Sequence, residues 1–450
     1  MKKTFRVSRN YPKVLRNRKR RIERRLAPRN WEKQAEPMMS GHNIHYALSD
    51  RTHAHGYGGI GAVHMMVQRL GLVKEIDEHI KLLKAHLPYH ESDHVLNIAY
   101  NMLAGAQRLE DIELRRQDES FLNGLGAQRI PDPTTAGDFT RRFLVEDITQ
   151  LQECINRARQ RVWQQQPEGF LAEAFIDVDR AVALVKPHAG TITLRGDTDF
   201  SHTAQLDRWD KQEMKFILGL DAHPKVVKLA EALAEGSWQR LERLPKYEIL
   251  TEPRSRRERV KEQIVVEKGY RNLKLVAEDV TDLAYKPHQC EQEYRLVIVR
   301  KNISVQRGER ALFEEIRYFF YLTNRWDLDV EAVVSLANGR CDQENVIEQL
   351  KNGVNAMRMP VDDLVSNWAY MVMTTLAWNL KAWFGLLVPD RERGLELLGM
   401  EFRRFLHAVM LLPVQISRTG RKIIYRVLSY NGWVKELFAT FQRIVALGSG

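Results

Sequence analysis

The spacing of apolar residues changes several times along the 450-residue chain. Between residues 36 and 168 these residues recur at helical spacing, as in "GAVHMMVQRLGLVKEIDEHIKLL", which predicts a mainly helical region. Residues 169–221 instead contain short elements bounded by turn residues: "AEAFIDVD", "RAVALVKPHAG", "TITLRGD" and "MKFILGLD". This order of strand, helix, strand and strand predicts a parallel α/β sheet.

The second half of the chain changes character twice. Residues 222–329 are highly charged and contain β-like runs, "QIVVE", "EYRLVIVRK" and "IRYFFYLT", which predict a β-rich insertion. Helical spacing then returns, so residues 330–390 and 391–450 are both predicted to be helical. The most apolar segment, "WAYMVMTTLAWNLKAWFGLLV", contains Asn379 and Lys381, which favours a buried helix over a membrane span.

Helix starts follow from capping residues. Ser92 or Asp93, and later Thr134 or Thr135, are the expected N-caps of two helices in the helical region.

Two further motifs match the residue spacing of known binding signatures but lack the structural context that those signatures need. "GYGGIG" lacks the preceding strand of a dinucleotide site, which favours a loop leading into a helix. In "HESDH", an N-cap at Ser92 or Asp93 leaves His90 outside the helix, away from His94.

Charge is distributed very unevenly. The net charge is +11, yet the first thirty residues hold thirteen Lys and Arg against one acid, Glu23. Residues 1–35 are therefore a basic arm, either a solvated tail or a segment that orders on phosphates. A basic segment of this kind predicts a nucleic-acid partner. Its candidate DNA-binding residues are Arg18, Lys19, Arg20, Arg21, Arg24 and Arg25.

Composition also bounds the compartment and the number of domains. With 44% apolar and 28% charged residues, the chain is expected to be soluble and to form two to four domains. It has no apolar signal-peptide core after Lys2 and Lys3. Three widely spaced cysteines predict a reducing environment. A cytoplasmic protein, associated with the nucleoid when bound to DNA, is therefore expected.

Paired carboxylates follow two of the predicted strands. Asp177 and Asp179 end "AFIDVD", and Asp197 and Asp199 follow "TITLRG". Ligands of open α/β sheets gather beyond the carboxyl ends of the strands. Ordinary turn residues are the simpler interpretation of one such pair, but two pairs converging there favour a divalent cation, and oxygen ligands suit Mg²⁺ or Mn²⁺.

A later helix supplies a third carboxylate. In "GRCDQENVIEQLKNG", Arg340, Glu344 and Lys351 are spaced at 0, +4 and +11. At about 100° per residue, all three project from one helical face. An exposed Arg and Glu pair on a solvated helix is the alternative explanation of the first two residues.

These motifs together resemble the DDE transposases of bacterial insertion sequences. The resemblance rests on "FIDVD", "LRGDTDF", the β-rich insertion and the R-x3-E-x6-K helix. The segments "RCDQENVIEQLKNGVNA" and "LVSNWAYMV" also resemble the corresponding sequences of the insertion-sequence-thirteen-eighty group, which is related to the insertion-sequence-four branch. The family's pattern has a tyrosine where this chain has Ala337.

The resemblance implies a fold, a cofactor and partners. It implies an α/β ribonuclease H-like core in which two Asp and one Glu hold two Mg²⁺ or Mn²⁺ ions, here Asp179, Asp197 and Glu344. Asp177 remains the alternative to Asp179 as first ligand. Arg340 and Lys351 would bind the DNA phosphate. The partners implied are the element's terminal inverted repeats, target DNA and a second copy of the chain when bound to the ends.

The two Asp pairs are unusually close in sequence. Between Asp179 and Asp197 lie seventeen residues, room for one crossover helix and one strand. The family fold also needs a β-hairpin there, which predicts an internal deletion after Asp179. The first strand should then be a sheet edge, parallel and adjacent to "TITLRGD". Little DNA cleavage in Mg²⁺ is expected, and a catalytically inactive DNA-binding derivative is the alternative function.

Overall fold

The computed structural model describes residues 11–26, 52–84, 88–176, 181–198, 203–242, 260–307, 310–339, 341–419 and 422–448. The chain divides into two compact units. The helical unit comprises Met1–Pro167 and Val346–Gly450, and the sheet unit comprises Glu168–Asn345. The two ends of the chain thus fold together. The predicted region 330–390 is wrong as a single piece, because the boundary between the units falls inside it.

Helices from both ends of the chain build the helical unit. The N-terminal segment contributes α1 (Tyr11–Leu26), α2 (Ile60–Arg69), α3 (Leu72–His79), α4 (Glu91–Leu103), η1 (Leu109–Asp111), α5 (Ile112–Arg116), α6 (Glu119–Leu125), α7 (Pro133–Thr140) and α8 (Val145–Trp163). The C-terminal segment contributes η5 (Gln349–Gly353), α15 (Leu364–Leu386), α16 (Arg391–Gly399), α17 (Phe402–Phe405), η6 (Leu406–Met410) and α18 (Val434–Ala446). The mainly helical prediction for residues 36–168 is confirmed for its described part.

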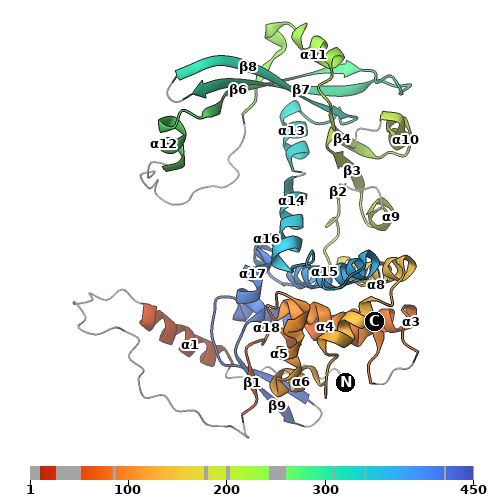
Figure 1. Cartoon of the computed structure of the whole chain (residues 1–450), viewed down its shortest axis with the longest axis vertical. Helices are drawn as coiled ribbons and strands as arrows, with labels where there is room; N and C mark the ends of the chain where they lie inside the picture. Colours follow the sequence, from red (N-terminus) through yellow and green to blue (C-terminus); the bar gives the residue numbers. More distant parts are fainter. Residues whose placement is uncertain are drawn as a thin grey trace, which may run out of the picture. The chain divides into compact units, whose positions relative to one another are not determined.

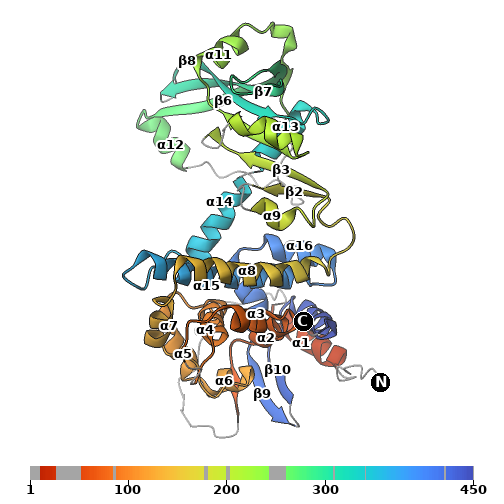
Figure 2. The same cartoon turned by 90° about the vertical axis from the view of Figure 1, so that its right-hand side faces the viewer.

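One continuous apolar core joins these two segments. The helices α8 and α15 lie side by side in Figures 1 and 2, and both contribute buried residues to this core. Leu380 and Phe384 of α15 have no exposed surface. The prediction of a buried helix in this apolar segment is therefore confirmed. Among the described residues, no helix has the length and apolarity needed to span a membrane.

A small antiparallel sheet completes the helical unit. It contains β1 (Ala54–His55), β9 (Val414–Thr419) and β10 (Lys422–Val427), in the order β1-β9-β10. The prediction that residues 391–450 are wholly helical is therefore wrong. The segment "VQIS" alternates apolar and polar residues in the manner of a strand, and "KIIYRV" is rich in the β-branched and aromatic residues typical of strands.

The glycine-rich motif "GYGGIG" serves close packing. The Gly58 N–H donates to the Leu412 carbonyl (2.8 Å) and the Gly59 N–H to the Met410 carbonyl (3.1 Å). A Cβ atom on Gly59 would lie 2.3 Å from the Val409 carbonyl oxygen, a contact that no side chain could make. The chain then enters α2 at Ile60, so the predicted loop leading into a helix is confirmed.

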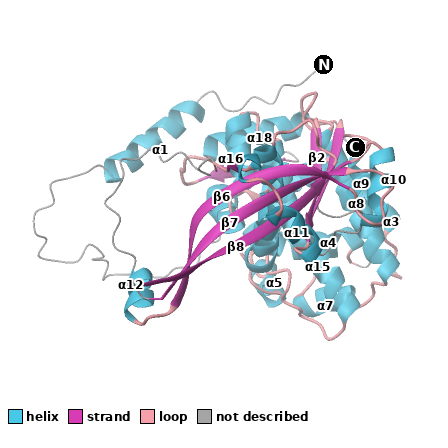
Figure 3. Ribbon diagram, turned by 90° about the horizontal axis from the view of Figure 1, so that it is seen from above, coloured by secondary structure: helices cyan, strands magenta, loops and turns pink. Residues whose placement is uncertain are grey.

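The sheet unit is built around seven strands in the order β2-β3-β4-β8-β7-β6-β5. The strands are β2 (Glu173–Ile176), β3 (Thr191–Gly196), β4 (Lys215–Leu220), β5 (Gln239–Arg240), β6 (Arg271–Tyr285), β7 (Tyr294–Arg307) and β8 (Arg310–Thr323). The first three are parallel, as predicted, and the others join antiparallel. Figure 3 shows β6, β7 and β8 side by side.

Helices cover both faces of this sheet. One face packs against α9 (Ala181–Val185), α10 (Leu206–Lys211) and α11 (Pro224–Glu231) around buried residues such as Leu194 and Phe216. The other packs against α13 (Val330–Asn338), whose Val333 and Val334 meet Ile217 of β4. Short η3 (Thr203–Gln205) and η4 (Glu235–Ser237) turns lie in the connections. The predicted α/β class is confirmed for this unit.

Several local predictions need correction. The β-rich segment is not a separate insertion, because β8 pairs with β4 in the same sheet. The run "QIVVE" lies in a helix, α12 (Val260–Glu267). Part of the basic arm is also helical, as α1. Periodicity could not separate helix from strand over so short an apolar run as "QIVVE".

The helix starts also differ from those expected. The N-cap of α4 is His90, so His90 does lie outside the helix, but neither Ser92 nor Asp93 is the cap. Asp93 instead accepts the His90 N–H (2.9 Å) from the third helical position. The N-cap of α7 is Asp132, because its carboxylate accepts the Thr135 N–H (2.8 Å), and Pro133 occupies the first helical position.

Candidate functional site

The end of β3 positions the predicted carboxylate Asp197. This residue follows Gly196, the last residue of β3, and is half-buried. Gly219 of the neighbouring strand β4 leaves room for it. A Cβ atom on Gly219 would lie 3.2 Å from the Asp197 carbonyl carbon and 3.1 Å from the Thr198 nitrogen. The backbone after β3 can therefore pass close to β4.

The pairing of β2 with β3 agrees with the sequence expectation. The two strands are adjacent and parallel, and their last paired residues are Ile176 and Leu194. β2 is the terminal strand of the sheet, and no strand in the described part of the chain pairs with its outer edge. Asp177, Asp179 and Arg180 lie outside the described residues, as does Asp199.

A buried polar cluster ties β2 to the segment between β8 and α13. The Arg325 guanidinium, with 7% of the residue exposed, donates to Glu173 Oε1 (2.5 Å). Thr193 Oγ1 donates to the same oxygen (2.6 Å). Arg325 Nε also donates to Asp327 Oδ1 (2.9 Å). Burial lowers the pKa of Arg325, but its hydrogen bonds to Asp327 and Glu173 outweigh this and raise the pKa above its usual value.

Arg195 connects the end of β3 with the end of α13. Its Nη1 donates to the Leu336 carbonyl (3.3 Å), and its guanidinium carbon lies 5.0 Å from the centre of the Phe175 ring. The sequence analysis overlooked this residue. Strand alternation was the available signal, because residues two apart, such as Arg195 and Asp197, belong to the same face of a strand.

The helix α14 (Cys341–Glu348) carries Glu344, whose side chain is exposed. The helix α14 comes after α13 in the sequence, and Arg340, between the two helices, lies outside the described residues. The next segment, η5, is a π-helical turn in which the Val354 N–H donates to the Gln349 carbonyl (3.1 Å). Lys351 lies in this turn. The expectation that Lys351 and Glu344 share one helical face assumed α-helical spacing throughout, whereas Lys351 lies in a π-helical turn.

The donor chemistry of these residues suits a hard cation. The described chain provides the carboxylates of Asp197 and Glu344, and carboxylate oxygens are preferred ligands of Mg²⁺ and Mn²⁺. The third predicted ligand, Asp179, is not among the described residues. Within the described ranges, no group of three or more His, Cys, Asp or Glu is placed to hold a metal ion.

The six predicted DNA-binding residues of the basic arm lie on α1. Lys19, Arg20, Arg21 and Arg24 are exposed, and Lys19 lies 3.6 Å from the Glu23 carboxylate. Arg18 differs from them because it donates to the carbonyls of Val427 (2.5 Å) and Ser429 (3.4 Å) at the end of β10. The Arg25 side chain lies outside the described part. Arg18 therefore anchors the helix, while the other four present charge to solvent.

The sequence matches the model of a known protein family. A family model described as "Transposase DDE domain group 1" matches residues 185–449, more than half of the chain. The matched range includes Asp197 and Glu344 and begins after Asp179. No curated protein matches the chain.

Proposed function

The chain belongs to the DDE transposases, and on that premise we propose that it cleaves DNA at the ends of a bacterial insertion sequence and transfers the strands to target DNA. One observation carries the proposal: the Arg195 contact with the Leu336 carbonyl brings the end of β3 against the end of α13. Asp197 follows the first of these ends and Glu344 the second. The family implies a ribonuclease H-like fold, and the mixed sheet with helices on both faces is compatible with it.

Three carboxylates form the proposed active site: Asp179, Asp197 and Glu344. Ile176 of β2 pairs with Leu194 of β3. Asp179 stands three residues after Ile176 in the sequence, and Asp197 stands three residues after Leu194. If the parallel register continues, the two carboxylates face the same side of the sheet. The three carboxylates would hold two Mg²⁺ or Mn²⁺ ions, which would activate the water or 3′-hydroxyl nucleophile and stabilise the leaving oxygen.

The chain's own residues position the DNA. Arg340 and Lys351 neutralise the phosphate that undergoes attack, and the exposed cations of α1 bind the backbone of the element's ends. Arg195, flanked by Phe175 and the Leu336 carbonyl, keeps the end of β3 in place. Two copies of the chain, one on each end of the element, are the proposed assembly. Within the DDE transposases, we propose that the chain belongs to the insertion-sequence-thirteen-eighty group.

A second candidate function is a catalytically inactive DNA-binding derivative. The position of β2 as the terminal strand and the seventeen residues between Asp179 and Asp197 are compatible with this function. The proposed deletion would remove the hairpin that should pair with β2. Metal ligands must be fixed to within about 0.5 Å for catalysis, and the strand that precedes Asp179 in the sequence has only four residues.

The deciding experiment is strand transfer by the full chain. The substrate is a duplex that carries the DNA flanking the coding sequence, incubated with Mg²⁺ or Mn²⁺. The transposase proposal predicts cleavage that Glu344→Gln abolishes while DNA binding persists. Cleavage that appears only after a hairpin from an intact relative is inserted behind Asp179 would establish the inactive derivative. DNA cleavage that survives both Asp197→Asn and Glu344→Gln would refute the proposed site.

A further inference from the structure

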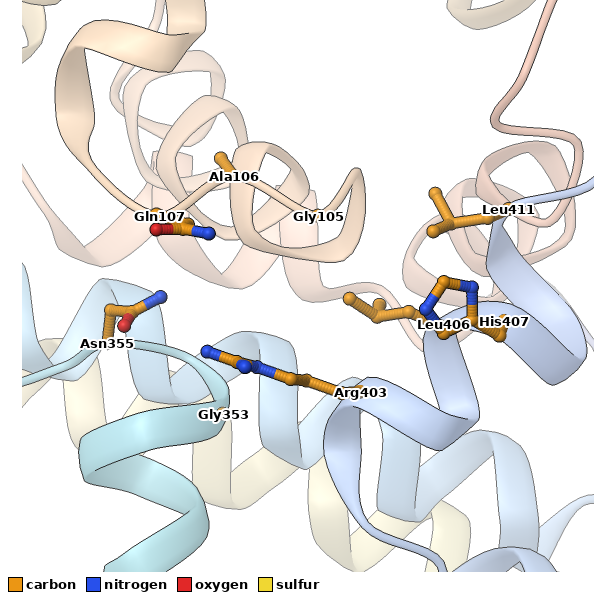
Figure 4. A pocket seen from close by; sticks show the side chains of 9 residues that line it. All are labelled: Gly105, Ala106, Gln107, Gly353, Asn355, Arg403, Leu406, His407 and Leu411. Atoms are coloured by element: carbon orange, nitrogen blue, oxygen red, sulfur yellow. The ribbon is translucent and has the colours of Figure 1, made fainter.

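A pocket of about 230 Å³ lies inside the helical unit, apart from the proposed carboxylate site. Its walls come from the loop after α4, from the end of η5 and from α17 with η6, as Figure 4 shows. It is lined by Gly105, Ala106, Gln107, Gly353, Asn355, Arg403, Leu406, His407 and Leu411. None of these nine described residues carries a carboxylate, so every charged or amide side chain in the lining can donate a hydrogen bond.

The polar groups gather at one end of the pocket. In Figure 4 the Arg403 side chain points toward Asn355, and Gln107 lies at the same end of the pocket. Arg403 Nη2 donates to the Asn352 carbonyl (3.3 Å), which orients the guanidinium. Arginine has five N–H donors in a fixed planar fork, so one such bond leaves others for a ligand. Close to Gln107 in sequence, the Asp111 carboxylate accepts the backbone N–H groups of Gln107 (2.7 Å) and Arg108 (3.3 Å).

The other end of the pocket is mainly apolar. There Leu406 and Leu411 lie beside the His407 ring (Figure 4). Arg403 and His407 are exposed, so the pocket opens to solvent. One end suited to an anion and one suited to an apolar group match a phosphate with its attached sugar. A free inorganic anion would use the first end alone.

The backbone around the pocket is specialised. Two π-helical turns, η5 and η6, flank it, and each closes with a hydrogen bond from residue i to residue i−5, Val354 to Gln349 and Leu411 to Leu406. Such turns occur frequently at functional sites. Asn355 has a left-handed backbone (φ 53°) although only 6% of it is exposed. Asparagine tolerates this conformation better than most residues, and it brings an amide to the pocket.

We propose that this pocket binds a backbone phosphate of DNA, held by Arg403, Asn355 and Gln107, with the sugar against Leu406 and Leu411. The choice of DNA as the source of the phosphate rests on the proposed function. The contact is to the backbone, so it adds affinity without reading sequence. It would give the helical unit a second phosphate contact that is independent of the cations on α1.

The test is DNA binding by the full chain, with a fluorescein-labelled duplex of random sequence and a salt titration. Arg403→Gln should weaken binding about tenfold and flatten the slope of log affinity against log salt by about 0.9, the loss of one phosphate contact. Asn355→Gly keeps the left-handed backbone accessible and removes only the amide, so it should also weaken binding. The matched control is Arg404→Gln, because Arg404 is on the same helix, is 69% exposed and does not line the pocket.

Equal losses for Arg403→Gln and Arg404→Gln would overturn the proposal, because general surface charge would explain both. A second arm measures thermal unfolding with inorganic phosphate against chloride at matched ionic strength. Stabilisation by phosphate that Arg403→Gln abolishes, together with unchanged DNA binding, would overturn the DNA assignment in favour of a free phosphate.

The two proposals fail separately. A chain that does not cleave DNA but loses affinity on Arg403→Gln would retain this site and refute only the transposase activity. A chain that cleaves DNA and binds it equally well with Arg403→Gln and Asn355→Gly would refute only this site.

Discussion

The helical unit and the sheet unit hold their peripheral elements by different means. In the helical unit, segments from both ends of the chain share one apolar core, with Phe384 fully buried. In the sheet unit, the terminal strand β2 is four residues long, and its Phe175 is 37% exposed. A polar bond from Arg325 to Glu173 secures that strand instead. Side-chain volume should therefore control the stability of the first unit, and a few polar contacts should control order near the proposed active site.

The largest effect is expected from the core of the helical unit. Phe384→Ala should lower the free energy of unfolding by about 3–5 kcal/mol, since it removes a buried ring and leaves a cavity. Phe175→Ala on the sheet edge is the matched control and should lower it by less than about 1 kcal/mol, as for most exposed positions. Urea denaturation followed by circular dichroism measures both. An equal decrease in the free energy of unfolding for Phe384→Ala and Phe175→Ala would contradict the difference between the two units.

The second effect concerns the polar bond that holds β2. Arg325→Gln should destabilise the sheet unit by about 1.5–3 kcal/mol, because Glu173 and Asp327 lose a charged donor. Amide hydrogen exchange should accelerate in β2 and much less in β7. Arg317→Gln is the control, since the ion pair of Arg317 with Glu315 is accessible to solvent and should contribute little to stability. Unchanged protection of β2 in Arg325→Gln would show that the strand does not depend on this cluster.

Much of the strand order near the site could be predicted from the sequence. The turn residues around "AEAFIDVD", "TITLRGD" and "MKFILGLD" separate three strands, and the short connection between the first two allows only a parallel crossover. The structure pairs β2, β3 and β4 in that way. The terminal position of β2 was likewise predicted, while the hairpin deletion behind that prediction remains a proposal.

Other features depend on contacts that local patterns do not encode. Lys351 lies in the π turn η5, where α-helical spacing does not hold. In the same turn, Gly353 packs closely against Phe402, which is distant in sequence. The division of residues 330–390 between two units depends on α15 joining the N-terminal helices in one core. The sequence did contain a signal for the β9–β10 pair, since Gly420 stands between two short runs with the composition of strands.

The third prediction separates DNA binding from metal binding. Replacing Lys19, Arg20, Arg21 and Arg24 with Gln should weaken DNA binding about tenfold or more and flatten its salt slope, because each phosphate contact contributes about 0.9 to that slope. Metal binding should not change. Arg18→Gln is the comparison, because Arg18 bonds to backbone carbonyls and should contribute less to the slope. An unchanged slope in the fourfold variant would leave α1 without a role in DNA binding.

The smallest effect expected is a pH dependence from Lys381 in the helical unit. Burial lowers its pKa from 10.5 to about 8, and its Nζ donates to the Leu398 carbonyl (3.0 Å). Below pH 8 the lysine is charged in both the folded and unfolded states. Between about pH 8 and 10.5 the unfolded chain binds more protons, so this group makes stability rise with pH.

Lys381→Met should remove that rise, and exposed Lys435→Met should keep it. Denaturant titrations at several pH values measure the difference. An identical pH profile for the wild type and Lys381→Met would contradict the assignment.

The central claim is that Asp197 and Glu344 belong to one metal site, and Mn²⁺ binding to the full chain, followed by electron paramagnetic resonance, tests it most directly. Asp197→Asn and Glu344→Gln should each weaken Mn²⁺ binding at least about tenfold. The double variant should lose little more than either single one, because both remove ligands of a shared ion. Glu348→Gln, one turn further along α14, should bind as the wild type does. Independent, additive losses from Asp197→Asn and Glu344→Gln, or an equal loss from Glu348→Gln, would contradict the shared site.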